Sequence, residues 1–241
     1  MFTASANTSQ GASQHALRPR CVHTITDRFS VSNTYLINDD RLLVVDPGSE
    51  VNVRLLTSYI QKFLHRSPAD IDLIVLTSMH QNHTAAIESL RRLCTASVAA
   101  SSAALTLTSA QQQRVSHKTM YTLPGRVDVF APLSIQQATL IDIWLQDVGG
   151  LPFHSDWRVI TSAGHTPESL CLYNPFTSEL LSGDTIVTIE NGMPLLRRGI
   201  NRRQLDETLR VLRSLPVHYL YPGHGRQIVG ETPLAKVQME H

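Results

Sequence analysis

The chain has 241 residues, a formal net charge of +1, 42% hydrophobic residues and 17% charged residues. This length suits one α/β domain, since such domains reach roughly 250 residues. The near-neutral charge offers no electrostatic basis for binding nucleic acid or an acidic membrane surface, and the composition is too apolar for a chain that is disordered throughout.

The N-terminal segment differs in composition from the rest. Residues 1–18 are rich in Ser, Ala, Gln and Thr without hydrophobic periodicity, and predict a flexible leader, or alternatively a docked tail, before a single domain at residues 19–241. The leader lacks the regions of a signal peptide, and no apolar run approaches the roughly 18–20 residues that span a bilayer. Three widely spaced cysteines argue against a disulfide framework or a cysteine zinc site. We therefore expect a cytoplasmic protein without a membrane partner.

The first half of the domain alternates short apolar runs with amphipathic segments. Runs bounded by turn residues are typical of buried strands, and apolar residues at intervals of three and four are typical of helices. In chain order we expect strands at 34–37 and 42–45 as a hairpin, a helix at 53–64, a strand at 71–76, a helix through Ile87, Leu90 and Leu93, a short strand at 98–100 and a weakly patterned helix at 103–118.

The second half begins with strands and ends with a helix and a strand. We expect strands at 127–131, 139–143, 157–161, 170–173 and 179–182, a helix carrying Leu205, Leu209, Leu212 and Leu215, and a last strand at 217–221. No linker separates the two halves, which repeat each other approximately. This pattern predicts a core of one sheet on another, covered on the outside by helices.

Five side chains that can ligate a metal follow expected strands, each beside Gly or another turn residue. They are His80, His83, His165, Asp184 and His224. Side chains at strand ends converge on one rim of a sheet, and imidazole and carboxylate groups are ligands for zinc, iron and manganese. We expect the other histidines to be surface or hydrogen-bonded core residues.

Six motifs carry a resemblance to a known family, in the expected order and spacing. They are Asn33-Thr34-Tyr35-Leu36-Ile37, Val44-Val45-Asp46-Pro47-Gly48, the loop 77–84, Gly164-His165-Thr166-Pro167, Gly183-Asp184 and Pro222-Gly223-His224-Gly225. Together they resemble the metallo-β-lactamase superfamily over nearly the whole chain after the leader. The resemblance implies an αββα four-layer sandwich of two mixed sheets covered by outer helices, with a dinuclear metal site at one edge. It also implies a stand-alone hydrolase of the glyoxalase II or lactonase kind, with a small-molecule substrate and no nucleic-acid domain; a homo-oligomer stays open.

The metal-binding loop departs from the family pattern. The family reads His-x-His-x-Asp-His, whereas this chain reads Ser78-Met79-His80-Gln81-Asn82-His83. By resemblance, residues 78, 80 and 165 form the first metal position, residues 82, 83 and 224 the second, and Asp184 bridges them. Ser78 thus replaces a histidine and Asn82 replaces the aspartate. Three good ligands plus water can hold a catalytic zinc, so we expect one ion rather than two: zinc, or alternatively iron or manganese.

The same changes affect the expected reaction. In the family, a metal-bound hydroxide attacks a carbonyl, and the loop aspartate orients it and helps to move protons. Asn82 can hold a water but cannot accept its proton, and general acid–base help is worth about 10²–10⁴-fold. We therefore expect Asn82 and Asp184 to act in a hydrolase of a small ester, thioester or lactone. The alternatives are a catalytically silent pseudoenzyme that serves as a binding module, and a dinuclear enzyme with an unrecognised ligand.

Further polar residues lie near these motifs. Residues 197–203 carry four arginines, for which we favour an exposed loop and helix face over carboxylate or phosphate binding. Asp46 is expected to orient a ligating histidine. Met79 either faces the site or packs below it.

Overall fold

The computed structural model describes residues 21–26, 32–106, 139–147, 149–189 and 192–239, and the backbone of residues 121–123 and 126–128. The expected leader at 1–18 lies outside the described residues, as do most of the helix expected at 103–118 and the end of the strand expected at 127–131. Within the described ranges, no helix has both the length and the hydrophobicity needed to cross a membrane.

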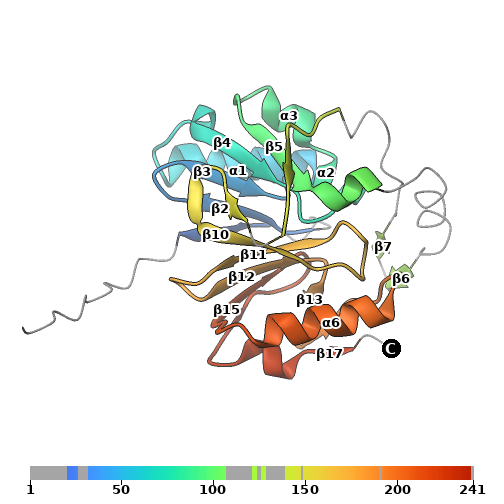
Figure 1. The fold of residues 1–241 in the computed structure, drawn as a ribbon. Coiled ribbons are helices and arrows are strands. Elements are labelled where there is room, and N and C mark those ends of the chain that lie inside the picture. Colours follow the sequence, from blue (N-terminus) through green and yellow to red (C-terminus); the bar gives the residue numbers. More distant parts are fainter. Residues whose placement is uncertain are drawn as a thin grey trace, which may run out of the picture.

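The first sheet has six strands in the order β1-β2-β3-β4-β5-β8 (Figure 1). They are β1 (Val22–Ile25), β2 (Thr34–Asn38), β3 (Leu42–Val45), β4 (Ile71–Val75), β5 (Ser97–Ser101) and β8 (Ile143–Leu145). Strands β2 and β3 pair antiparallel, which confirms the hairpin, whereas β3, β4, β5 and β8 are parallel neighbours.

The second sheet also has six strands, in the order β16-β15-β12-β11-β10-β9. They are β9 (Gly150–Leu151), β10 (His154–Thr161), β11 (Leu170–Asn174), β12 (Glu179–Gly183), β15 (Tyr219–Pro222) and β16 (Ile228–Val229). Its one parallel pair, β12 with β15, makes the sheet mixed. Smaller sheets join β13 (Ile186–Thr188), β14 (Pro194–Leu196) and β17 (Gln238–Met239), and β6 (Tyr121–Leu123) with β7 (Arg126–Asp128).

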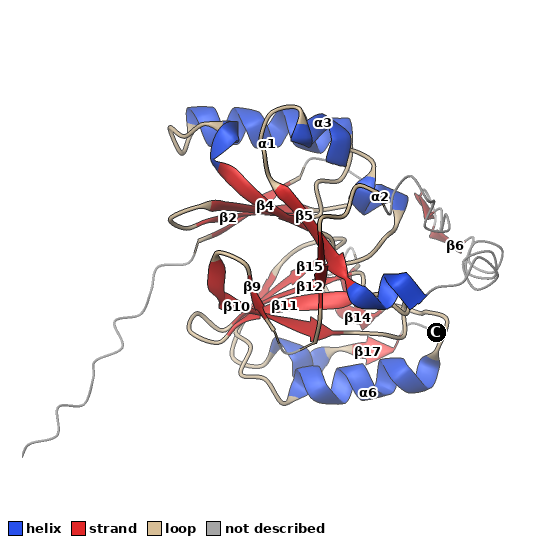
Figure 2. Cartoon of the chain, turned by 45° about the horizontal axis from the view of Figure 1, so that its top comes forward, coloured by secondary structure: helices blue, strands red, loops and turns tan. Residues whose placement is uncertain are grey.

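Helices cover the outer faces of the two large sheets (Figure 2). Within the described residues, the α-helices are α1 (Glu50–Lys62), α2 (Gln81–Thr84), α3 (Ile87–Arg91) and α6 (Arg202–Arg213), and the 3-10 helices are Pro68–Asp70, Ser102–Thr106 and Pro233–Lys236. Helices α1 and α3 lie on the first sheet, and α6 lies on the second.

Successive side chains of a strand point to opposite faces of its sheet, and this alternation divides the core into three apolar layers. In β3, Leu42 and Val44 pack under α1 and α3, while Leu43 and Val45 pack between the sheets. In β11, Leu172 lies between the sheets, and the outer face of that sheet packs against α6. Four layers of structure around three apolar layers form the predicted αββα sandwich.

Several expected elements have different bounds in the structure; the helix expected to carry Leu215, for example, ends at Arg213. The helix expected through Leu93 ends at Arg91, and Leu93 is 46% exposed because it lies beyond the helix end. The strand expected at 139–143 begins only at Ile143, because parallel pairing with β5 starts there, opposite Ala99.

Candidate metal centre

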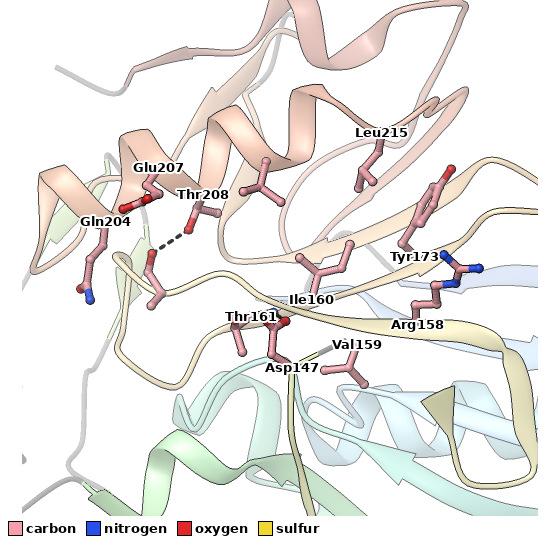
Figure 3. Close-up of a pocket in the computed structure, with 12 residues that line it drawn as sticks. Asp147, Arg158, Val159, Ile160, Thr161, Tyr173, Gln204, Glu207, Thr208 and Leu215 are labelled. Carbon is pink, nitrogen blue, oxygen red and sulfur yellow. Dashed lines mark hydrogen bonds between the residues drawn. The ribbon is translucent and has the colours of Figure 1, made fainter. Parts of the chain in front are cut away.

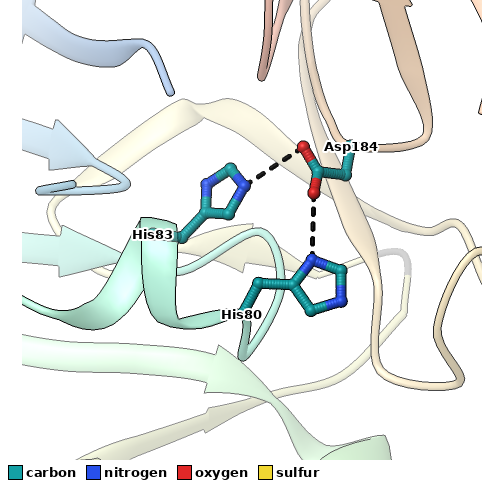
Figure 4. Close-up of side chains that lie close together, drawn as sticks. All are labelled: His80, His83 and Asp184. Atoms are coloured by element: carbon teal, nitrogen blue, oxygen red, sulfur yellow. Dashed lines mark hydrogen bonds and ion pairs between the residues drawn. The ribbon is translucent and has the colours of Figure 1, made fainter. Parts of the chain in front are cut away.

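The five predicted ligands come together around the Asp184 carboxylate. Oδ1 lies 3.1 Å from His83 Nε2 and 3.0 Å from His224 Nε2. Oδ2 lies 2.9 Å from His80 Nδ1 and 3.7 Å from His165 Nε2. All five residues are buried. Each carboxylate oxygen therefore faces a different pair of imidazoles, and Figure 4 shows one histidine of each pair.

Both sheets contribute to this centre. The loop after β4 carries His80 and His83, and α2 begins directly after His80, so the two imidazoles lie three residues apart on one side of a short helix. Asp184 and His224 follow the parallel neighbours β12 and β15. The amide of Gly223 donates to the Gly183 carbonyl at 2.7 Å, which holds these two strand ends together.

Two of the imidazoles have their outer nitrogen fixed by an acceptor. His83 Nδ1 lies 2.8 Å from Asp46 Oδ2, which also accepts the Thr77 hydroxyl at 2.6 Å. His165 Nδ1 lies 2.8 Å from the carbonyl oxygen of Arg198. Such partners fix the tautomer and orientation of metal-binding histidines, so that Nε2 of each ring faces the centre with its lone pair. The expected contact of Asp46 with a candidate ligand is thus present.

The donor set fits a divalent metal. With the single proton of neutral His83 directed to Asp46, its Nε2 lone pair faces Asp184 Oδ1 at 3.1 Å, and two lone pairs repel unless a proton or a metal ion lies between them. Burial by itself lowers the pKa of His83, but the Asp46 and Asp184 carboxylates raise it to about 10. One donor atom each from His80, His83 and Asp184 lie within 4.8 Å of one another. The position next to Oδ1 therefore suits either a proton or a metal ion.

The other groups have the protonation states that a metal requires. Burial lowers the pKa of His80 and His224, and burial together with His80 lowers that of His165 to about 4. These rings are neutral at pH 7, the form in which imidazole binds metals. Burial opposes ionisation of Asp184, yet His83 and His224 bring the pKa of its carboxyl well below the usual range.

The two substituted positions, Ser78 and Asn82, differ in their contacts. Ser78 is buried, and among the described residues its hydroxyl has no hydrogen-bond partner. The Asn82 side-chain nitrogen lies 3.2 Å from His224 Nε2, so the amide borders the Oδ1 half of the centre. Met79 is buried in the apolar layer beneath α1 and α3, which answers the question of where it packs.

The prediction that the arginines of residues 197–203 are exposed is wrong for Arg197. This side chain is buried, and its Nη1 lies 3.1 Å from Asp184 Oδ2, because the chain after β14 returns to the centre. Arg198, Arg202 and Arg203 are exposed, as expected. Nothing in a run of four arginines distinguishes the first from the others, so the sequence held no signal for this contact.

Glu168 is a second buried polar residue that was not expected. It lies inside the motif around His165, and burial raises the pKa of its carboxyl. Its position three residues after a candidate ligand, where the chain turns back into β11, was the available signal.

A separate pocket of about 420 Å³ lies on the outer face of the second sheet, beside α6 (Figure 3). Its walls include Arg158, Tyr173 and Glu207, and the Thr208 hydroxyl at its edge donates to the Ala163 carbonyl at 2.9 Å. None of the residues around Asp184 lines it. This pocket is therefore distinct from the candidate metal centre.

A sandwich of two mixed sheets with histidines and an aspartate gathered at its strand ends defines a class of metal-dependent enzymes. The chain belongs to the metallo-beta-lactamase superfamily, whose sequence profile matches residues 27–224. A probable metallo-hydrolase of Methanocaldococcus jannaschii is 25% identical over 215 residues, which is 80% of this chain and 87% of that protein.

Solved structures share the fold. A protein crystallised in a di-iron-bound form superposes with a TM-score of 0.59 at 22% identity, over 86% of this chain and 94% of that chain. The B3 metallo-beta-lactamase BLEG-1 superposes with a TM-score of 0.62 at 20% identity, over 86% of this chain and 93% of that chain. Membership of the superfamily supports a metal-dependent hydrolase in general.

Proposed function

We propose that this protein hydrolyses a small ester, thioester or lactone with one divalent metal, zinc in the first instance, held by His83, His224 and Asp184. The observation that carries the proposal is the convergence of His83 Nε2 and His224 Nε2 on one oxygen of Asp184, at 3.1 and 3.0 Å. Three protein ligands plus an open position are typical of a catalytic zinc.

When bound, the metal supplies a Lewis acid that lowers the pKa of a coordinated water to about 7. Asp46 holds the Nδ1 proton of His83 and so keeps Nε2 available as a ligand. Asp184 supplies the negative charge that offsets the charge of the metal. The Asn82 amide, 3.2 Å from His224, can orient a water by hydrogen bonding but cannot accept its proton.

The lack of a proton acceptor at residue 82 narrows the substrate class. Loss of a general base costs about 10²–10⁴-fold in rate, which slows the hydrolysis of an amide more seriously than that of an activated acyl group. Esters, thioesters and lactones have better leaving groups or ring strain. These compounds are therefore the substrates we propose.

The test compares hydrolysis of a panel of esters, thioesters and lactones by the wild type, by His83→Ala and by His218→Ala. His218 is an exposed histidine and serves as the matched control. We expect His83→Ala or a chelator to reduce turnover by at least about 10²-fold, and His218→Ala to leave it unchanged. Turnover that survives both His83→Ala and the chelator contradicts the role of the metal. No turnover of any compound contradicts the hydrolase proposal and favours the binding module.

A further inference from the structure

The two halves of the centre have equal numbers of good ligands. His83, His224 and Asp184 Oδ1 form one half, and His80, His165 and Asp184 Oδ2 form the other. Three donors plus water are enough for a zinc ion in either half. The number of ligands alone therefore does not decide which half holds a metal, or whether both do.

Arg197 makes the two halves unequal. Its guanidinium Nη1 lies 3.1 Å from Asp184 Oδ2, the oxygen that faces His80 and His165. The arginine is held there by its own backbone, because its amide donates to the Thr185 carbonyl at 3.0 Å, one residue after Asp184. The contact is thus built into the return of the chain after β14.

The charge on this side chain is permanent. Guanidinium stays protonated in proteins, and burial of a cation is costly unless an anion lies beside it. The Asp184 carboxylate, whose Oδ2 lies 3.1 Å from the guanidinium, is such an anion. A divalent ion bound to Oδ2 would share that oxygen with the guanidinium, and the two positive charges would repel each other at short range.

The same half has also lost a ligand. Ser78 stands where the family has a histidine, and its hydroxyl is buried without a hydrogen-bond partner among the described residues. One half of the centre therefore combines a missing imidazole with an added cation. These two changes have the same consequence, because each weakens metal binding to Oδ2.

We infer that Arg197 takes the place of the first metal ion: it supplies the positive charge at Asp184 Oδ2, so that the chain binds a metal only at His83, His224 and Oδ1. This inference rests on the proposed metal-dependent function. Arg197 is a positioning residue in this account. It occupies Oδ2 of Asp184 and leaves Oδ1 to the single ion.

The test counts zinc ions per chain by elemental analysis after loading with excess zinc and removing the unbound ion. The proteins are the wild type, Arg197→Met, Ser78→His with Arg197→Met, and Arg202→Met as the control at an exposed arginine. We expect one zinc in the wild type and in Arg202→Met, and two in both variants that lack Arg197. The double variant should hold the second ion more tightly because it regains an imidazole.

The outcomes separate the two proposals. Two zinc ions in the wild type, or a count that does not change when Arg197 is removed, overturns the role of Arg197 and leaves the hydrolase proposal standing. No zinc in the wild type overturns the hydrolase proposal and, with it, the inference that rests on it.

A measurement on the wild type covers the case in which removal of a buried arginine prevents folding. Calorimetric titration with zinc should give a second equivalent that binds at least about 100-fold more weakly than the first, a difference of about 2.7 kcal/mol. A second equivalent that binds more tightly than this overturns the inference.

Discussion

At the scale of single residues, Asp46 orients the candidate ligand His83. Its Oδ2 lies 2.8 Å from His83 Nδ1, and the carboxylate is held in turn by the Thr77 amide and hydroxyl. We predict that Asp46→Asn weakens zinc binding by about 10–100-fold, because a neutral amide orients and polarises the imidazole less well. Competition with a chromophoric chelator measures the dissociation constant. Asp40→Asn, at an exposed aspartate, should leave it unchanged, and an unaltered constant in Asp46→Asn would show that Asp46 has no such role.

Glu168 gives a pH-dependent prediction. Burial raises the pKa of its carboxyl above the ordinary value of 4.5, so the folded chain binds more protons than the unfolded chain above that pH. The stabilisation from protonated Glu168 is therefore complete below pH 4.5 and is lost as the pH rises through the folded pKa.

Glu168→Gln carries a neutral side chain at every pH and avoids this loss. We predict that the free energy of unfolding of the metal-free wild type falls relative to that of the variant as the pH rises from 4.5 to about 7, as measured by urea denaturation. Glu231→Gln, at an exposed glutamate, should show no such trend. A constant difference between the wild type and Glu168→Gln would mean that the pKa is not raised.

At the scale of elements, the end of β12 determines where Asp184 lies. Gly183 has a φ of +49°, and a Cβ at this position would overlap the Thr77 side chain that is bonded to Asp46. We predict that Gly183→Ala lowers the free energy of unfolding by about 1–3 kcal/mol and reduces zinc affinity, since strain and overlap both act at the centre. Gly230→Ala is the matched control, because no heavy atom lies within 4 Å of its Cβ. Equal losses in the two variants, measured by urea denaturation and zinc titration, would contradict the prediction.

Comparison of the expected and observed helices and strands shows which elements a sequence can predict. The hairpin of β2 and β3 and the helix α1 were predicted because apolar periodicity and turn residues determine them locally. The two-residue strands β9 and β16 were not predicted, because each is defined only by its pairing with the neighbouring strand. Strand β8 was misplaced for the same reason, because β5 decides where pairing starts.

At the scale of the whole molecule, the sequence predicted the sandwich and the set of side chains that converge on Asp184. Strand ends and the family resemblance were enough for this, because all five residues follow strands that meet at one edge. The contact of Arg197 with Asp184 was not predictable, since it depends on how the chain returns after β14 and leaves no local pattern. We therefore propose that the occupancy of the two halves depends on tertiary structure as well as on the loop 77–84.

The most direct test of the account is the anomalous difference map of wild-type crystals grown with zinc, from X-ray data collected on both sides of the zinc absorption edge. We predict one peak per chain, within coordination distance of His83 Nε2, His224 Nε2 and Asp184 Oδ1. A peak between His80 and His165, or no peak at all, would contradict the account.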